Sequence, residues 1–315
     1  MHLMIPYAAS HAEGCVATLP TLKLPHLQKL LQHLRAQAPD EGDEFSLSPP
    51  HERALAQALG LPTTEGQIPW AARQAAQQAD LAHLGGAWAF VSLCNWQAHM
   101  KEVTLRQMPM QDLSAAESDT LLAAMQPFFA EDGITLYPFE VGCWLAHSDL
   151  FAQLPTASPD RVHGSDLTPW MPKGGQAGKL MRLLSEMQML LYTHPVNDRR
   201  VARGALPVNA FWLHGTGVFP ATPNLTPEKS MPTVVDTLRD AALREDWPEW
   251  ATAWQTLDAQ HGKALLDAHR QGQAVELTLC GERRAQTWRS EPLGLLQKFK
   301  GVFGTYPLHN MLEQL

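Results

Sequence analysis

The sequence lacks the patterns of several large protein classes. It has no run of about 18 apolar residues, so we expect no membrane-spanning helix. Its first residues, MHLMIPYAAS, have no basic stretch before an apolar core and no cleavage-site pattern, so we expect no secretory signal. With a net charge of −8, general attraction to nucleic acid or to an anionic membrane is not expected. We therefore expect a cytoplasmic protein.

Cysteine is scarce, and its spacing argues against two common uses. The four cysteines, Cys15, Cys94, Cys143 and Cys280, are far apart, so the spacings of zinc fingers and of thioredoxin-like motifs are absent. We expect reduced and mostly buried thiols in a reducing compartment.

The remaining composition is that of an ordinary globular protein. Hydrophobic residues make up 45% and charged residues 18% of the 315 positions, which is enough apolar material for one large domain or two smaller ones. Residues 179–192 show a wide apolar helical face, and 274–280 alternate as a strand does. Because strands and helices alternate along the chain, we predict an α/β fold with at least one mixed sheet.

Two segments show the signals of helix starts. Ser114 is followed three residues later by Glu117, which is the pattern of a capping box, and we expect that helix to end before Pro127. Ser48 precedes Pro49 and Pro50, so Ser48 is expected to cap a helix that continues to Gly60. Helices are also expected over 233–244 and 248–269, and an amphipathic segment over 293–315.

One stretch carries a family resemblance. Residues 192–217, YTHPVNDRRVARGALPVNAFWLHGTG, resemble a segment of the archaeal-type cofactor-independent phosphoglycerate mutases. In that family a helix leads into HPVN, and an Arg, a Gly, Pro-x-Asn and a strand ending in Gly-x-Gly follow. The matching residues here are His194, Pro195, Val196, Asn197, Arg200, Gly204, Pro207, Asn209, Gly215 and Gly217.

Weaker agreements occur in the same order around this stretch, at 24–27, 59–71, 88–95 and 155–164, so the resemblance covers roughly residues 1–217. The segments SLSPPHERALA, EMQMLLYTHPVND, FWLHGTG and LTLCGER are similar to a bacterial group of RpfE-type regulatory, phosphoglycerate mutase-like proteins.

The resemblance implies an alkaline-phosphatase-like α/β core, with a mixed sheet flanked by helices, interrupted by an inserted α+β domain on the substrate side. We assign the core to residues 1–50 and 218–315 and the insert to 51–217.

The resemblance also implies two divalent metal ions, usually manganese or zinc, held by aspartate and histidine, and here the expected ligands are missing. Tyr7 stands where an aspartate is expected after the first strand, and Leu279-Cys280-Gly281-Glu282-Arg283 stands where Asp-His-Gly is expected. The candidate metal ligands are Asp258, His261 and Cys280, although Asp258 and His261 are interpreted more readily as exposed polar residues of a helix. The family's Asp-x-x-x-His ligand loop has no clear equivalent either, and Asp258 with His261 is the nearest candidate. Because three ligand sites differ, two-metal phosphoryl transfer is not expected.

The candidate nucleophiles are Ser46 and Ser48, although helix capping explains them as well. Candidate ligand-binding residues are His194, Asn197, Arg200, Arg203, Asn209 and His214, because guanidinium groups suit phosphate or carboxylate and His and Asn add neutral hydrogen bonds. Structural roles compete here too, with Asn197 in a turn or cap and Arg200 paired with Asp198 or Glu186. At Gly215 and Gly217, a backbone could approach a ligand closely.

Three functions therefore stay open. The sequence favours a non-catalytic or regulatory protein that binds a phosphorylated or carboxylate small molecule, or a protein partner, with no cofactor. The alternatives are an active phosphoglycerate mutase or phosphatase that uses manganese or zinc through relocated ligands, and a purely structural interaction module.

Overall fold

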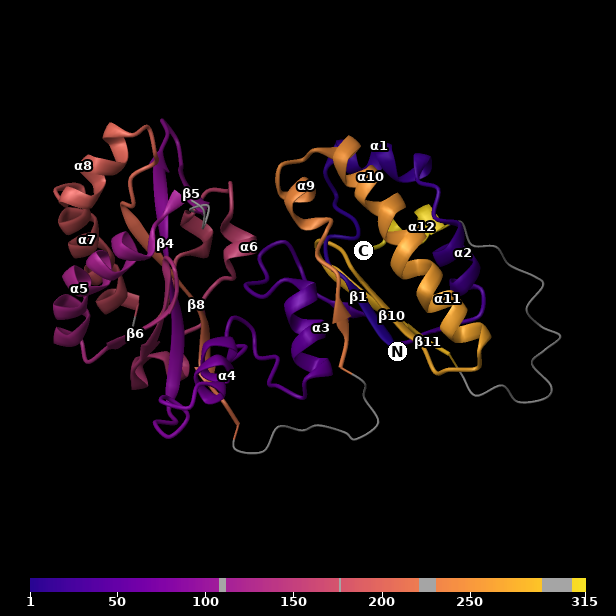
Figure 1. Ribbon diagram of the computed structural model, residues 1–315, viewed down its shortest axis with the longest axis horizontal. Coiled ribbons are helices and arrows are strands. Elements are labelled where there is room, and N and C mark those ends of the chain that lie inside the picture. Colours follow the sequence, from indigo (N-terminus) through magenta and orange to yellow (C-terminus); the bar gives the residue numbers. More distant parts are fainter. Residues whose placement is uncertain (108–111, 176, 221–230, 291–307) are drawn as a thin grey trace. The chain divides into compact units, whose positions relative to one another are not determined.

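The computed structural model describes all 315 residues except 108–111, 176, 221–230 and 291–307. The chain forms two compact units (Figure 1). Unit 1 comprises residues 1–44, 49–60 and 224–315, and unit 2 comprises 45–48 and 61–223. The sequence-based boundaries, at 50/51 and 217/218, differ from this division mainly over residues 51–60. Within the described part of the chain, no helix is long and apolar enough to cross a membrane.

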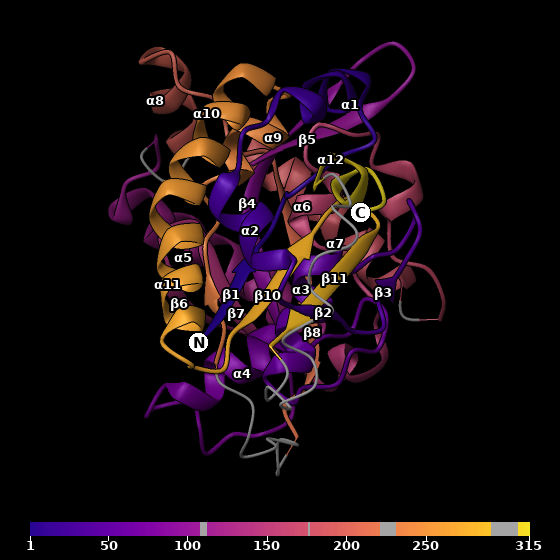
Figure 2. The same ribbon diagram turned by 90° about the vertical axis from the view of Figure 1, so that its right-hand side faces the viewer.

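Unit 1 is built on a six-stranded mixed sheet with the order β2-β11-β10-β1-β9, in which β3 also pairs with β11 (Figure 2). Its strands are β1 (His2–Ile5), β2 (Arg35–Ala36), β3 (Asp40–Glu41), β9 (Thr233–Val234), β10 (Glu276–Cys280) and β11 (Arg284–Arg289). β1 runs parallel to β9 and β10, whereas β11 is antiparallel to β10. The expected α/β class with a mixed sheet is confirmed.

Helices pack on both faces of this sheet. They are α1 (Glu13–Thr18), α2 (Pro25–Leu31), α3 (Pro50–Ala58), α9 (Arg239–Leu243), α10 (Trp247–Leu257), α11 (Lys263–Arg270) and α12 (Leu308–Leu312). Because side chains alternate along a strand, Leu277 and Leu279 join the core under α10 and α11, while Cys280 faces α3. Burial of each such leucine stabilises the fold by about 1.5–3 kcal/mol.

Unit 2 is built on an antiparallel five-stranded sheet with the order β5-β4-β7-β6, in which β8 pairs with β4. Its strands are β4 (Ala87–Ala98), β5 (Val103–Gln107), β6 (Thr135–Glu140), β7 (Cys143–His147) and β8 (Ala210–Val218). The helices are α4 (Trp70–Gln77), α5 (Ala115–Glu131), α6 (Pro159–Val162), α7 (Ala177–Tyr192) and α8 (Pro195–Ala202).

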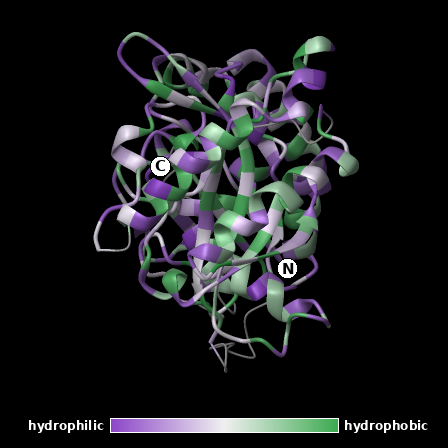
Figure 3. Ribbon diagram, turned by 90° about the vertical axis from the view of Figure 1, so that its left-hand side faces the viewer, coloured by the Kyte–Doolittle hydropathy of each residue, from purple (hydrophilic) through white to green (hydrophobic). Residues whose placement is uncertain are grey.

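The two faces of this sheet are covered differently. One face packs on the apolar sides of α5 and α7 in a single large core, and hydrophilic and hydrophobic residues alternate along the ribbons on that side (Figure 3). The other face carries two smaller apolar clusters. One lies under α4 and contains Trp88 and Leu145. The second lies near α6 and contains Cys94 and Trp212.

Three sequence-based expectations are wrong. The helix that Ser114 and Glu117 cap does not end before Pro127 but runs on to Glu131, because the buried side chains of Met125 and Phe129 anchor it on both sides of the proline. Thr233 and Val234 form β9 rather than a helix, since they pair with β1. Ser48 does not cap α3, which begins after Pro49 without a side-chain cap. Residues 293–307 of the expected C-terminal amphipathic segment lie outside the described residues.

Candidate functional site

The carboxyl ends of parallel strands are the usual ligand-binding edge of such a sheet. β1 is followed there by Tyr7, whose φ of 57° lies in the left-handed region that residues with a Cβ rarely adopt. The Tyr7 carbonyl accepts a hydrogen bond from Trp250 Nε1 at 3.0 Å, and its ring centroid lies 5.2 Å from that of His51. These contacts hold Tyr7 in the left-handed backbone conformation, which is disfavoured by on the order of 1–3 kcal/mol of free energy.

Glu282, just after β10, lies at this edge of the sheet and is hydrogen-bonded to the loop that follows β1. Its Oε2 accepts hydrogen bonds from the His11 backbone at 2.9 Å and from Ser10 Oγ at 3.3 Å, and it lies 3.3 Å from His11 Nδ1. Burial alone would raise the pKa of Glu282, but the His11 and Ser10 hydrogen bonds and the His11 charge lower it overall. Both side chains stay partly exposed, at 44% for His11 and 38% for Glu282.

Cys280 does not reach this edge with its side chain. It is fully buried and packs with Met4, Ala285 and two residues of α3, Ala54 and Leu55. Burial raises the pKa of its thiol well above the ordinary range, because the apolar surroundings disfavour the thiolate. A metal would need that thiolate.

Asp258, at 2% exposure, is buried rather than exposed, so the expectation of a polar surface residue is wrong. It lies in a π-helical turn, Asp258–Gly262, between α10 and α11. Its Oδ1 accepts from the backbone N–H of Leu27 at 2.8 Å, and its Oδ2 pairs with His26 Nδ1 at 2.8 Å. Asp258 thus satisfies the otherwise unpaired N–H groups that begin α2. His261 lies half-buried in the same turn.

These observations test whether the predicted ligands fit a pair of metals. Tyr7 offers a phenol, Cys280 is enclosed by apolar side chains, and both oxygens of Asp258 are engaged by α2. Among the residues that the structure describes, no three His, Cys, Asp or Glu side chains are grouped closely enough to hold a metal ion. The predicted set therefore does not fit the bimetallic centre that the resemblance implies.

The candidate nucleophiles lie in the short segment of unit 2 that precedes α3. Ser48 is buried, and its Oγ accepts a hydrogen bond from Gly66 N–H at 3.1 Å. Its backbone N–H donates to Glu65 Oε1, as does that of Leu47. Ser48 therefore joins two loops of unit 2. Ser46 is half-buried and lies outside regular structure.

The HPVN residues are arranged around the start of α8. His194 is its N-cap and accepts a hydrogen bond from Val196 N–H at Nδ1, while burial, assisted by Arg199, lowers its pKa. Asn197 is buried, and its amide donates to the carbonyls of Leu191 and Val208 and accepts from Val208 N–H, all within 2.8 Å. Asn197 thus ties the end of α7 to the start of β8, rather than capping a turn.

The two predicted arginines, Arg200 and Arg203, both pair with Glu117, which the sequence indicated only as a capping residue. Arg200 is fully buried, with Nη1 3.4 Å from Glu117 Oε2, and Arg203 Nη1 lies 2.9 Å from Glu117 Oε1. Asp198 and Glu186 are not the partner of Arg200. Burial alone would raise the pKa of Glu117, but hydrogen bonds from Arg203 and Ser114 lower it to about 2. This ion pair connects α5 with α8.

Arg200 also donates to two backbone carbonyls, those of Leu206 at 2.8 Å and Asp112 at 2.6 Å, and Arg203 shares the second at 3.1 Å. Asn209 is paired with the backbone of Trp96 through both its amide oxygen and its amide nitrogen. These contacts give Arg200, Arg203 and Asn209 structural partners. Their role toward a ligand stays a prediction.

His214 is the predicted ligand residue with the most distinctive surroundings. Its Nε2 lies 2.9 Å from Ser92 Oγ of β4, and Ser92 Oγ in turn donates to Cys143 Sγ of β7 at 3.4 Å. The His214 ring lies 5.2 Å from that of Phe90. Burial lowers the pKa of His214 to about 4, against a small opposing effect of Asp160, so its imidazole is neutral at physiological pH.

The Gly-x-Gly of β8 serves close packing. A Cβ at Gly215 would come within 3.0 Å of the Phe90 ring, and one at Gly217 within 3.0 Å of Pro69 Cβ. Thr216 between them is buried and donates to the Leu154 carbonyl at 2.6 Å. The backbone that approaches Gly217 is therefore that of Gln67 and Pro69, ahead of α4, whereas side chains approach Gly215.

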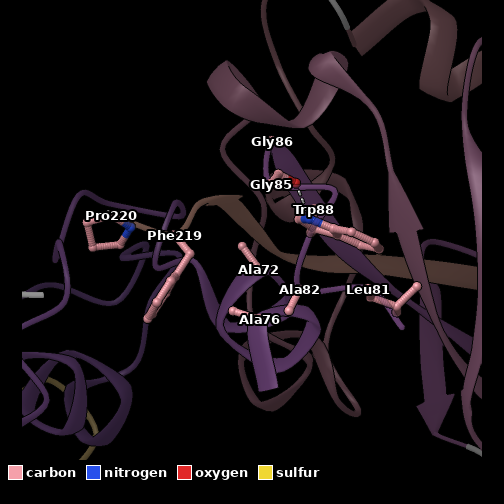
Figure 4. A pocket seen from close by; sticks show the side chains of 9 residues that line it. All are labelled: Ala72, Ala76, Leu81, Ala82, Gly85, Gly86, Trp88, Phe219 and Pro220. Atoms are coloured by element: carbon pink, nitrogen blue, oxygen red, sulfur yellow. Dashed lines mark hydrogen bonds between the residues drawn. The ribbon is translucent and has the colours of Figure 1, made fainter. Parts of the chain in front are cut away.

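An apolar cavity of about 290 Å³ lies beside α4 (Figure 4). Its lining consists mainly of small residues with the Trp88 ring on one side, and Trp88 Nε1 donates to the Gly85 carbonyl at 2.7 Å. The lining residues are Ala72, Ala76, Leu81, Ala82, Gly85, Gly86, Trp88, Phe219 and Pro220.

Comparison with known proteins gives one consistent group. No protein-family model matches the chain. A probable 2,3-bisphosphoglycerate-independent phosphoglycerate mutase of Geobacter sulfurreducens is 27% identical over 134 residues, which are 41% of this chain and 33% of that protein. The enzyme of that name from Methanothrix thermoacetophila is 26% identical over 118 residues, or 36% and 28%. The matches thus span only about a third of these relatives.

This chain is phosphoglycerate mutase-like. Two solved structures are also similar to it. A cofactor-independent phosphoglycerate mutase of Thermoplasma acidophilum has 14% identity and a TM-score of 0.39, and covers 100% of this chain and 99% of its own. A protein of Pyrococcus horikoshii has 12% identity and a TM-score of 0.44, with 92% and 86% covered. The α/β class of this chain is shown directly by its own two sheets.

The predicted site residues are dispersed in this phosphoglycerate mutase-like chain. Arg200 and Arg203 come together, and Asp258 and His261 share one turn, whereas Cys280 and His214 have other neighbours. Sequence reasoning selected Glu117 only as a capping residue. It missed Ser92 and Cys143 because the register of β4, β7 and β8 cannot be read from the chain.

Proposed function

We propose that this phosphoglycerate mutase-like chain does not carry out two-metal phosphoryl transfer, and that it acts by binding a small phosphorylated or carboxylate molecule. The observation that supports this most directly is the pairing of Asp258. Its Oδ1 accepts a hydrogen bond from the Leu27 N–H at the start of α2, and its Oδ2 pairs with His26 Nδ1. Moving Asp258 onto a metal would leave the buried N–H of Leu27 without its partner, which costs about 1–3 kcal/mol. The buried thiol of Cys280 and the phenol of Tyr7 also support the proposal, because neither group is a good metal ligand here.

The enzymatic half of the proposal is tested on the purified full chain. After equilibration with manganese or zinc and removal of unbound metal, elemental analysis should find well below one equivalent, and 3-phosphoglycerate should not be converted to 2-phosphoglycerate. Two tightly held equivalents of metal, together with turnover that a chelator abolishes, would overturn the proposal.

The binding half is tested by thermal shift with 3-phosphoglycerate, pyruvate and, as an uncharged comparison, glycerol. A ligand present at 100 times its Kd stabilises the native state by about 2.7 kcal/mol, which is readily measured. Arg203→Ala and His11→Ala then distinguish the predicted arginine region from the edge of the unit 1 sheet. Equal melting temperatures with and without both acids would count against binding.

One observation favours the alternative, an active metal-dependent mutase or phosphatase with relocated ligands. His11 and Glu282 form a partly exposed imidazole–carboxylate pair at the carboxyl edge of β1 and β10, where such chemistry would be expected. Under this alternative Glu282→Gln removes both bound manganese or zinc and turnover. Under our proposal it removes neither, because neither is present.

A further inference from the structure

Three side chains on adjacent strands of unit 2 form a polar cluster that the proposed function does not use. Ser92 on β4 is opposite Cys143 on β7 in the strand register, and His214 approaches it from β8. The distances are 2.9 Å from Ser92 Oγ to His214 Nε2 and 3.4 Å from Ser92 Oγ to Cys143 Sγ. A hydroxyl within hydrogen-bond reach of an imidazole nitrogen is the arrangement of a nucleophile and its base.

This cluster lies where the cover of the sheet is incomplete. On the same face, Trp88 and Leu145 are buried under α4, and Trp212 is buried near α6. Ser92, Cys143 and His214, between these two apolar clusters, are each half-buried. The adjoining rings are Phe90 and Phe139, with centroids 5.6 Å apart. A few polar groups beside apolar walls are typical of small-molecule sites.

The protonation states suit a nucleophile–base pair. The imidazole of His214 is neutral at physiological pH, because burial lowers its pKa to about 4. Its Nε2 can accept the Ser92 proton when that hydroxyl turns from Cys143 Sγ toward it. The Cys143 thiol keeps its proton, because burial raises its pKa to about 11.

We propose that Ser92 is a nucleophile, activated by His214, that accepts an acyl group from a small activated ester without a metal ion. This proposal goes beyond the proposed function, because it rests on the contact between Ser92 and His214 and on a chemical step rather than on ligand binding.

In the step proposed, a bond forms between Ser92 Oγ and the acyl carbon while the hydroxyl proton passes to His214 Nε2. The ester C–O bond then breaks, and the leaving alcohol takes that proton. Water, deprotonated by His214 in the same way, cleaves the acyl-serine to release the acid and restore Ser92. Phe90 and Phe139 provide an apolar wall for the acyl chain.

The test uses an alkyl fluorophosphonate on the full-length chain, followed by peptide mass spectrometry. Ser92 Oγ should attack phosphorus and displace fluoride, so the mass increment should appear on the peptide that contains Ser92. His214→Gln should slow labelling about 100-fold or more, in line with the usual contribution of a general base. Ser92→Ala should remove the label from that peptide.

Ser185→Ala provides the matched control, because Ser185 is an exposed serine on α7 whose hydroxyl donates to the Met181 carbonyl. Its labelling should equal that of the wild type. The labelling rate should fall as the pH is lowered through about 4, as His214 takes up a proton beside Asp160 and Cys143.

Wild-type protein that is unlabelled at Ser92, or labelled at the same rate after His214→Gln, would refute the proposal. Both results are independent of how well Ser92→Ala folds. Slow release of nitrophenol from a nitrophenyl acetate ester, lost in His214→Gln, should accompany a positive result.

Discussion

The two units use their polar side chains in different ways. In unit 1, Asp258 and Glu282 are engaged in joining backbone segments, and Cys280 is sealed in an apolar cluster. In unit 2, a buried ion pair joins two helices, and Ser92, His214 and Cys143 lie half-buried on one face of the sheet. The comparison teaches that the predicted metal ligands Asp258 and Cys280 of unit 1 are held in contacts of the fold, while a hydrogen-bonded cluster of Ser92, Cys143 and His214 lies in unit 2.

The largest effect is expected from the buried ion pair of unit 2. Arg200→Ala leaves Glu117 partly uncompensated beside α8, so the free energy of unfolding should fall by about 3–5 kcal/mol. Urea denaturation followed by circular dichroism measures the change. Arg199→Ala, an exposed neighbour on the same helix, should stay within about 0.5 kcal/mol of the wild type. If Arg200→Ala and Arg199→Ala lowered the free energy of unfolding equally, the buried ion pair would not stabilise unit 2 in the way described.

The next largest effect is expected on the free energy of unfolding at acidic pH. Because the pKa of His214 is about 4 in the folded state and ordinarily 6.5, the unfolded state binds a proton first as the pH falls. Stability should therefore be lost between about pH 6.5 and pH 4, by roughly 3 kcal/mol at most. His214→Asn should flatten this part of the stability profile relative to the wild type. An unchanged profile in urea titrations at each pH would contradict the buried neutral imidazole.

A smaller effect is expected in unit 1 from Asp258→Ala. Loss of the side-chain acceptor at the start of α2 should destabilise the protein by about 1–2 kcal/mol. The loss should be the same with and without a chelator, since the carboxylate holds a helix rather than a metal. Dependence of the difference on manganese or zinc would instead assign Asp258 to a metal site. Lys263→Ala, an exposed change nearby, serves as the control.

The smallest effect is expected at Tyr7. Tyr7→Gly relieves the positive φ but removes the ring that lies beside His51, so the two contributions oppose each other. The net change in the free energy of unfolding, measured by urea denaturation, should stay within about 1 kcal/mol of the wild type. Tyr7→Ala keeps the strain and loses the ring, so it should be less stable than Tyr7→Gly. The reverse order would show that the backbone at this edge is relaxed.

Much of the fold could be predicted because local signals agreed with packing. The capping box at Ser114 and Glu117 forms as expected, since both partners lie within one helical turn. The wide apolar face of 179–192 becomes α7 on the main core of unit 2. The helix signal failed at Thr233 and Val234, where pairing with β1, far away in sequence, outweighed local preference.

The candidate site was harder to predict, because its contacts join distant parts of the chain. Nothing near Asp258 in the sequence indicates that it caps a helix that begins at Pro25. Asp198 and Glu186 are the acids that the sequence offers near Arg200, whereas its partner Glu117 lies 83 positions away. His214 was chosen from its place beside the glycines, and its neighbour Ser92 depended on strand register.

The sequence by itself determined the composition, the helical and strand periodicities, the capping box at Ser114 and Glu117 and the family resemblance. Each of these depends on residues close together in the chain or on an ungapped pattern. Only the tertiary structure decided which polar groups meet. Burial and pairing set whether a carboxylate holds a helix, whether a guanidinium has a counter-charge and whether an imidazole is neutral, and these depend on neighbours that the fold brings from elsewhere.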